Sequence, residues 1–162
     1  MSSENTSFKF TDENLKRIEE SVKKYPHSKA AVMDAVYVAQ EQNGYITNEA
    51  MQEIANVLNI DTVDVYGVVT FYTMYFQKPM GKHHIMVCTN VSCMLRGAYE
   101  IYDSLKEKLG IDHMERTDDG QFSIEEAECL GACGYAPMMC VNEDFHENLT
   151  KEKVFEILDS LK

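Results

Sequence analysis

The sequence predicts an α/β (α+β) protein, in which an N-terminal helical bundle precedes a unit whose mixed β-sheet is flanked by helices. In the first half, apolar residues recur at the spacing of an α-helix, usually behind a polar capping residue. In the second half, short apolar runs typical of strands alternate with helical stretches. The composition changes between Lys78 and Gly81, so we expect a helical domain over residues 1–80 and an α/β domain over residues 81–162.

Four helices are expected before this boundary, because each stretch places its apolar residues on one side. The expected helices lie between Thr11 and Pro26, from Lys29 to Gln42, between Thr47 and Leu58, and from Asp61 to Val65. Side-chain oxygens at the start of such a stretch accept hydrogen bonds from the first free backbone amides. Asn43-Gly44 supplies a left-handed stop for the second helix.

Strands and helices are both expected after the boundary. The expected elements are a strand at His84–Val87, a helix at Leu95–Leu109, strands at His113–Arg116 and Phe122–Ala127, a hairpin of Pro137–Val141 with Phe145–Glu147, and a last helix capped by Thr150. This order of strand, helix, strands and helix predicts an α/β sandwich with a mixed sheet, thioredoxin-like in outline.

The cysteines are the strongest functional signal in the chain. Four of the five form two close pairs, Cys88 with Cys93 and Cys129 with Cys133. Four thiolates from two loops suit a [2Fe-2S] cluster, in which each pair binds one iron, or a single zinc ion. Cys88 ends an expected strand and Cys93 precedes an expected helix, so both loops can meet at one end of the sheet.

Spacing alone favours iron–sulfur but leaves a structural zinc site open, since zinc accepts similar spacings. A thioredoxin-type redox pair is disfavoured, because neither pair has two intervening residues. Gly131 and Gly134 let the second loop curl around the sulfurs and direct backbone amides at them, which would tune a cluster's potential. Cys140 lies in an apolar run and is interpreted as a core residue, not a ligand.

Composition narrows the expected partners and location. The formal net charge of −12 argues against nucleic acid, and it either steers the protein to a basic partner or only keeps it soluble. We expect no membrane insertion, since no apolar stretch has the length of a membrane span. The polar stretch Met1–Phe10 lacks the apolar block of a secretory signal, so a cytoplasmic protein with reduced thiols is expected.

Two further features have competing interpretations. His83 and His84 face opposite ways on a strand, so solvation at a strand edge is favoured over a metal or proton-transfer pair. The aromatic run Val69–Phe76 fits either core packing or a partner-binding surface. No nucleotide-binding glycine motif, catalytic triad or dyad is present, so no catalytic residue is expected in this chain.

Taken together, these motifs resemble the ferredoxin-like E subunits of NADH:quinone oxidoreductase, respiratory complex I. The resemblance covers about Asn14 to Leu161 and strengthens the iron–sulfur interpretation. It is carried by both cysteine pairs with Ala136-Pro137-Met138, by Gly44-Tyr45-Ile46, by the run Val65–Met74, and by Glu147-Asn148-Leu149-Thr150. Cys140 is a departure to which the resemblance assigns no role.

The resemblance implies an N-terminal helical bundle and a thioredoxin-like domain that holds one [2Fe-2S] cluster on Cys88, Cys93, Cys129 and Cys133. It implies a non-catalytic electron-transfer role, in which the chain exchanges single electrons with FMN on a larger NADH-binding partner, the F-type subunit of the complex. Other peripheral-arm subunits are implied partners, and the complex would be peripheral to the inner membrane. Equivalent subunits of NAD-linked hydrogenases and formate dehydrogenases are alternatives, and a zinc-stabilised interaction module is the alternative from another class.

Overall fold

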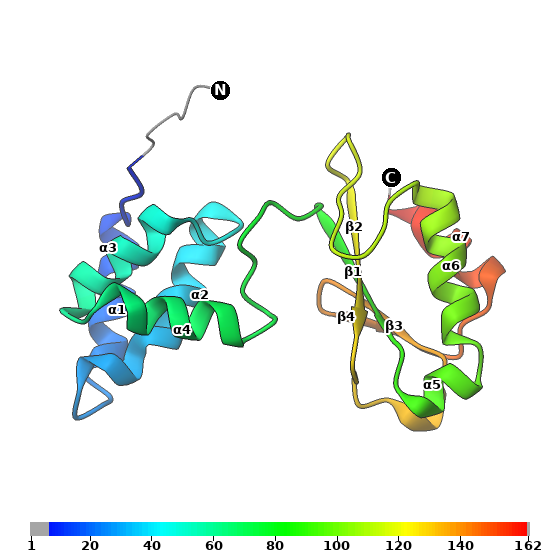
Figure 1. The fold of residues 1–162 in the computed structure, drawn as a ribbon, viewed down its shortest axis with the longest axis horizontal. Helices are drawn as coiled ribbons and strands as arrows, with labels where there is room; N and C mark the ends of the chain where they lie inside the picture. Colours follow the sequence, from blue (N-terminus) through cyan, green and yellow to red (C-terminus); the bar gives the residue numbers. More distant parts are fainter. Residues whose placement is uncertain (1–6, 162) are drawn as a thin grey trace. The chain divides into compact units, whose positions relative to one another are not determined.

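The computed structural model describes residues 7–161, so part of the N-terminal stretch Met1–Phe10 lies outside the described residues. The chain divides after Pro79 into two compact units, which are described separately (Figure 1). Independent folding of the two expected domains stays a prediction. In the described part of the chain, no helix is long and apolar enough to cross a membrane.

The first unit is the expected helical bundle. Its helices are α1 (Asp12–Val22), α2 (Val32–Asn43), α3 (Asn48–Leu58) and α4 (Thr62–Phe71), with a 3₁₀ turn at Ser28–Ala31 before α2. The Thr11 hydroxyl accepts from the Asn14 amide at 3.2 Å, and the Thr47 hydroxyl accepts from the Ala50 amide at 3.1 Å. Both predicted caps are therefore confirmed, as is the left-handed stop at Gly44.

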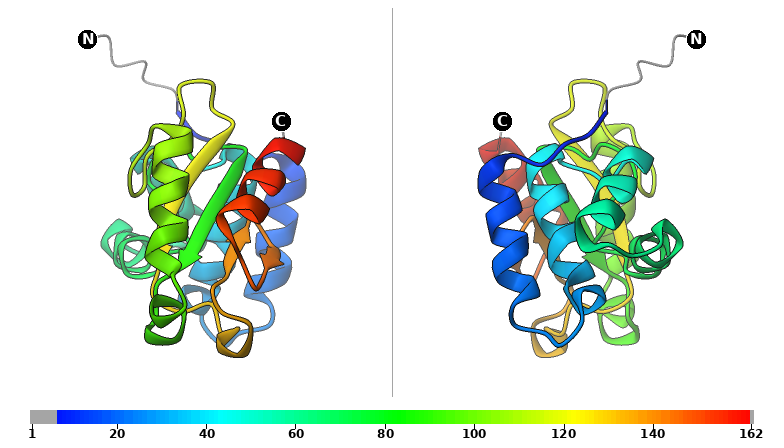
Figure 2. Two further views of the ribbon diagram at one scale, coloured as in Figure 1. Left: turned by 90° about the vertical axis from the view of Figure 1, so that its right-hand side faces the viewer. Right: turned by 90° about the vertical axis from the view of Figure 1, so that its left-hand side faces the viewer.

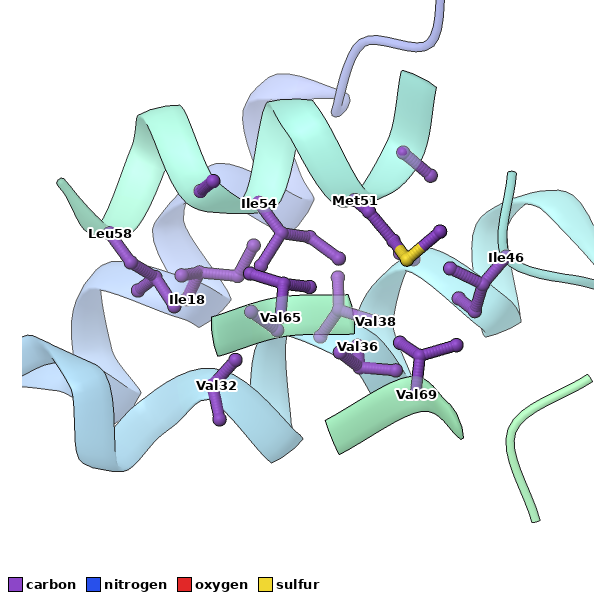
Figure 3. Packing of buried hydrophobic residues seen from close by; sticks show 14 of the residues in the cluster. Ile18, Val32, Val36, Val38, Ile46, Met51, Ile54, Leu58, Val65 and Val69 are labelled. Carbon is purple, nitrogen blue, oxygen red and sulfur yellow. The ribbon is translucent and has the colours of Figure 1, made fainter. Parts of the chain in front are cut away.

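Branched aliphatic side chains from all four helices meet in the core of this unit (Figure 3). Ile18, Val36, Ile54 and Val65 come from α1, α2, α3 and α4, and each is almost fully buried. Burial of such a side chain stabilises the fold by about 1.5–3 kcal/mol. The amphipathic faces predicted from the sequence therefore point inward.

Helix α4 differs from its prediction, because it continues past Val65 to Phe71. After Val65, apolar residues occur on every side of the helix, so no amphipathic pattern marks its second half. Val65 and Val69 nevertheless pack into the core and hold this half helical. The Asp61 side chain makes no capping hydrogen bond; its backbone carbonyl accepts from the Asp64 amide instead, at 3.0 Å.

The second unit contains the expected mixed sheet. Its strands are β1 (His83–Cys88), β2 (Phe122–Ala127), β3 (Met139–Val141) and β4 (Asp144–His146), in the order β2-β1-β3-β4. The β1–β2 pair is parallel, whereas β1–β3 and β3–β4 are antiparallel. The predicted hairpin and mixed sheet are confirmed.

Helices cover one face of this sheet. The helices of the unit are α5 (Val91–Leu95), α6 (Ala98–Leu109) and α7 (Lys151–Ser160). Figures 1 and 2 show α6 and α7 side by side on the same face. Leu105 of α6 and Leu158 of α7 pack with Ile85 and Ile124 of the sheet in one buried cluster. The Thr150 hydroxyl caps α7, as predicted, by accepting from the Lys153 amide.

Two predictions in this unit were wrong in detail. The helix expected at Leu95–Leu109 is split into α5 and α6 by Gly97, whose φ of 91° lies in the left-handed region. His113–Arg116 forms no strand beyond a single bridge from Arg116 to Ser123. The contact with β2 is short: the Met114 amide donates to the Ile124 carbonyl at 2.7 Å and the Ile124 amide donates to the Glu115 carbonyl at 3.3 Å. The His113 amide donates to the Asp112 carboxylate instead of to a neighbouring strand.

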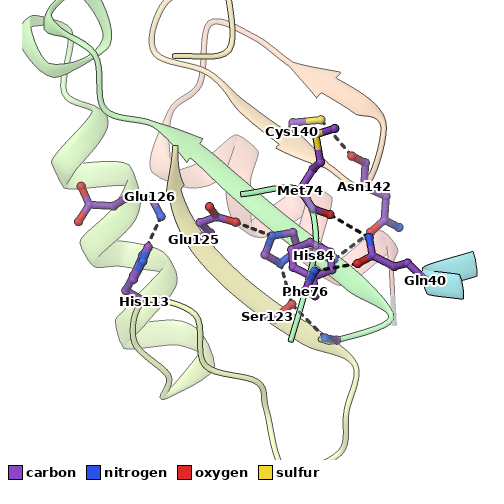
Figure 4. A network of polar contacts seen from close by, with 11 residues as sticks. Gln40, Met74, Phe76, His84, His113, Ser123, Glu125, Glu126, Cys140 and Asn142 are labelled. Atoms are coloured by element: carbon purple, nitrogen blue, oxygen red, sulfur yellow. Dashed lines mark hydrogen bonds and ion pairs between the residues drawn. The ribbon is translucent and has the colours of Figure 1, made fainter. Parts of the chain in front are cut away.

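His84 is buried, so the predicted solvation at a strand edge was wrong for this residue. Strand β1 lies between β2 and β3 and is not an edge strand. The His84 ring lies 2.8 Å from the Ser123 hydroxyl and 3.0 Å from a Glu125 carboxylate oxygen (Figure 4). The sequence could have indicated these partners, because Ser123 and Glu125 are two residues apart and therefore lie on one face of β2.

Candidate iron–sulfur site

The two cysteine loops leave the sheet at the same edge. Cys88 is the last residue of β1 and is in register with Ala127, the last residue of β2. The Thr89 amide donates to the Ala127 carbonyl at 3.0 Å, which continues the pairing past the end of β1. Because β1 and β2 are parallel, their carboxyl ends lie together. Cys129 follows Ala127 by two residues, so both loops start from one place.

The first cysteine pair is buried against the end of the sheet. Cys88 and Cys93 are each only 1% exposed. The sequence predicted that Cys93 precedes a helix, but Cys93 lies inside the short helix α5. Burial first, then the hydrogen-bonded Cys88 thiol and the nearby Cys133 thiol, raise the pKa of Cys93 to about 11. Cys88 and Cys93 also belong to one buried cluster at this end of the sheet.

The second cysteine pair is exposed on its loop. Cys129 and Cys133 are both exposed, and Cys133 begins a 3₁₀ turn, Cys133–Tyr135. Gly131, between them, has a φ of 80°, a left-handed conformation that other residues rarely adopt. The loop therefore turns at Gly131, whereas its predicted curl around the sulfurs stays a prediction. The predicted amide hydrogen bonds to sulfur stay a prediction.

The two loops pack against each other. Cys88 and Cys93 belong to a buried cluster with Ala98, Ala136 and Met138, and Leu130 and Ala132 of the second loop pack against it. The Cys88 amide also donates to the Met138 carbonyl at 3.2 Å. This apolar cluster holds the second loop beside the first cysteine pair.

The donor set suits a [2Fe-2S] cluster. Two thiols are fixed at the end of the sheet, and the other two lie on an adjoining loop with a left-handed glycine. That division supplies two sulfurs for each of two irons. Within residues 7–161, no three cysteine, histidine or carboxylate side chains are already gathered in the geometry of a metal site. The assignment of all four cysteines as ligands therefore stays a prediction.

Cys140 lies apart from these loops. It is buried in β3, in register with Met86 of β1 and Phe145 of β4. Its thiol donates to the Asn142 carbonyl at 3.3 Å, and burial raises its pKa. The interpretation of Cys140 as a core residue is confirmed.

The fold and the site together define a class of protein: a helical bundle followed by a thioredoxin-like α/β unit with two converging cysteine loops. Residues 18–162 match the model of the thioredoxin-like [2Fe-2S] ferredoxin family. The chain belongs to this family. The predicted cofactor, one [2Fe-2S] cluster, is the one that the family carries.

Similar proteins cover the whole chain. It is 44% identical over 165 residues to the E subunit of NADH-quinone oxidoreductase from Rickettsia bellii (strain RML369-C), with 100% of this chain and 99% of that protein aligned. It is 43% identical over 162 residues to the mitochondrial NADH dehydrogenase [ubiquinone] flavoprotein 2 of Dictyostelium discoideum, with 98% of this chain and 66% of that protein aligned. These relatives confirm the resemblance noted from the motifs.

A solved structure shares the fold at low sequence identity. The NAD⁺-reducing [NiFe]-hydrogenase in its H₂-reduced state aligns with 80% of this chain at a TM-score of 0.70 and 17% identity. The aligned part is only 22% of that hydrogenase chain. At this identity the match shows a common fold and carries no further inference.

Proposed function

We propose that this chain is the electron-transfer subunit of an NADH:quinone oxidoreductase complex and carries one [2Fe-2S] cluster. The observation that carries the proposal is the full-length similarity to the E subunit of NADH-quinone oxidoreductase, in a chain whose two cysteine loops leave one edge of the sheet. The ligands would be Cys88 and Cys93 on one iron, and Cys129 and Cys133 on the other.

The bound cluster would supply single-electron chemistry, and the chain's own residues would hold and orient it. Cys88 and Cys93 would anchor its buried side, where the apolar cluster around Met138 excludes water. Cys129 and Cys133 would lie on its exposed side, where a redox partner can approach. That partner would be the larger subunit that binds NADH and FMN, so this chain would exchange single electrons with the flavin and bind no substrate itself.

The same proposal covers location and assembly. The chain would be cytoplasmic and would associate with the inner membrane only through the complex, beside other peripheral-arm subunits. The rival within the class is the equivalent subunit of an NAD-linked hydrogenase or formate dehydrogenase. The catalytic subunit that co-purifies with this chain distinguishes these complexes.

Cluster content tests the proposal directly. After anaerobic purification, we expect about two iron and two sulfide per chain, a reddish-brown colour, and an EPR signal on reduction. Cys129→Ser or Cys133→Ser should remove most of the visible absorbance, because one iron loses a ligand. Cys140→Ser is the matched control and should keep it. A colourless protein with bound zinc would support the zinc-stabilised module instead, and an unchanged spectrum in the Cys129 variant would refute the ligand assignment.

A further inference from the structure

Helix α4 presents an exposed and uncharged side, which we call the α4 face. Successive turns of the helix contribute its members, Val63, Tyr66, Gly67, Thr70 and Phe71. Phe71 is 77% exposed, Val63 70% and Tyr66 52%. None of these side chains carries charge. Large exposed apolar side chains that adjoin one another mark interaction sites more often than chance.

The one acidic residue of α4 does not reach this face. Asp64 forms an ion pair with Lys29 at 2.8 Å, and Lys29 lies in the 3₁₀ turn before α2. The opposite side of α4 is anchored in the core through Val65 and Val69. The orientation of the α4 face is therefore set by packing on its other side.

The segment after α4 is tied to the helical unit by ring contacts and hydrogen bonds. The Phe71 and Tyr72 rings pack edge to face at 5.0 Å, and Tyr72 packs against buried Tyr75 at 6.2 Å. The Gln40 side chain donates to the Met74 carbonyl at 2.8 Å and accepts from the Phe76 amide at 2.7 Å (Figure 4). The edge-to-face contact with Tyr72 supports the exposed Phe71 ring in the free chain, and a side chain that is already supported loses less entropy on binding.

Gly67 forms a notch in the middle of the α4 face. A Cβ built on Gly67 would meet no atom within 4 Å among the described residues, and its φ does not lie in the left-handed region. Nothing within the described chain therefore requires glycine there, although glycine inside a helix costs about 1 kcal/mol relative to alanine. A notch between apolar side chains allows the backbone of another segment to approach closely.

We propose that the α4 face binds an uncharged, apolar segment of another subunit, with Phe71 as the anchor and Gly67 as the point of closest backbone approach. The inference rests on the proposed function, because it needs a multi-subunit complex. An uncharged face selects an uncharged partner surface, since burial of an unpaired charge is costly. A second copy of this chain is disfavoured, because each copy has a formal net charge of −12 and two copies repel.

Site-specific photo-cross-linking identifies the occupant. The full chain, affinity-tagged and produced in its source cells, would carry a photoreactive phenylalanine analogue at position 71, and the complex would be purified after illumination. We expect cross-links to one apolar peptide of a different subunit. The matched control is the same analogue at Phe145, a 54% exposed aromatic of β4, which should not label that peptide. Cross-links only to a second copy, or to residues 80–162 of the same chain, would overturn the proposal.

Two substitutions separate binding from folding. Phe71→Lys should lower the recovery of the complex by about tenfold, the size of a moderate interface residue, while Phe145→Lys leaves it unchanged. Gly67→Leu should also lower recovery, although leucine favours the helix and should not lower the melting temperature of the free chain. Both variants should keep the cluster absorbance. If both variants recover as much complex as the wild-type chain, the proposed role of the α4 face is refuted and the proposed function stands. If the wild-type chain itself carries no cluster and purifies with no partner, the proposed function is refuted.

Discussion

The buried hydroxyl of Tyr102 is a cost to the fold that a single substitution can remove. Tyr102 is 3% exposed, and its hydroxyl has no hydrogen-bond partner among the described residues. Tyr102→Phe should therefore leave the free energy of unfolding unchanged or raise it by up to about 1 kcal/mol, measured by urea unfolding at pH 7. Tyr75→Phe is the matched comparison, because the Tyr75 hydroxyl donates to the Met33 carbonyl at 3.3 Å and its loss should destabilise.

The same hydroxyls predict how stability depends on alkaline pH. Burial raises the pKa of both Tyr75 and Tyr102 from 10 to about 12, and nearby acidic groups add to the shift of Tyr102. Between these values the unfolded chain loses a proton that the folded chain keeps, so stability falls as pH rises from about 10 to about 12. Each Phe variant should show a shallower fall. An equally steep fall in the double variant would contradict this assignment.

The parallel pairing of β1 and β2 depends on close backbone approach at Gly81. A Cβ there would lie 2.3 Å from the Phe122 carbonyl carbon, which is backbone and cannot move aside cheaply. Gly81→Ala should destabilise the protein by about 1–3 kcal/mol in urea unfolding. Gly67→Ala, in open space on α4, should instead stabilise it by about 0.5–1 kcal/mol. Changes of the same sign in both variants would contradict the steric argument.

Elements with a strong local signal could be predicted from the sequence. Hydroxyl caps at Thr11, Thr47 and Thr150 and period-matched apolar residues located three helices, and β1 and β2 were placed correctly before the cysteine loops. The second half of α4 has no amphipathic period, and only its packing in the bundle reveals it. His113–Arg116 makes a few backbone hydrogen bonds to β2 but does not extend into a strand, because Met114 has a φ of 58° and the Asp112 carboxylate accepts from the His113 amide.

The sequence predicted that the two cysteine loops start at one end of the sheet, but it did not predict the environment of each pair. Spacing and strand order indicated that Cys88, Cys93, Cys129 and Cys133 share one end of the sheet. The sequence does not show that the first pair is buried and the second exposed, because Met138 and Leu130, which pack at the first pair, lie far from it in the chain. His84 was missed for the same reason, since its partners lie on another strand.

For the whole molecule, separate cores predict separate stability. Ile54 lies in the core of the helical unit, whereas Ile124 lies in the core of the α/β unit. Ile54→Ala should destabilise the helical unit by about 2–5 kcal/mol. If residues 1–80 and 81–162 are independent domains, the Ile54→Ala variant should lose its cluster absorbance at the same urea concentration as the wild-type chain.

Ile124→Ala completes the comparison, because it removes the same side-chain volume from the core of the unit that carries the cysteine loops. It should shift the loss of cluster absorbance to lower urea and leave the main helical transition, followed by circular dichroism, near its wild-type midpoint. Coincident shifts of both signals in both variants would instead mean that the chain unfolds as one cooperative unit. The helical bundle would then contribute directly to the stability of the cluster site, and the prediction that the two domains fold independently would be refuted.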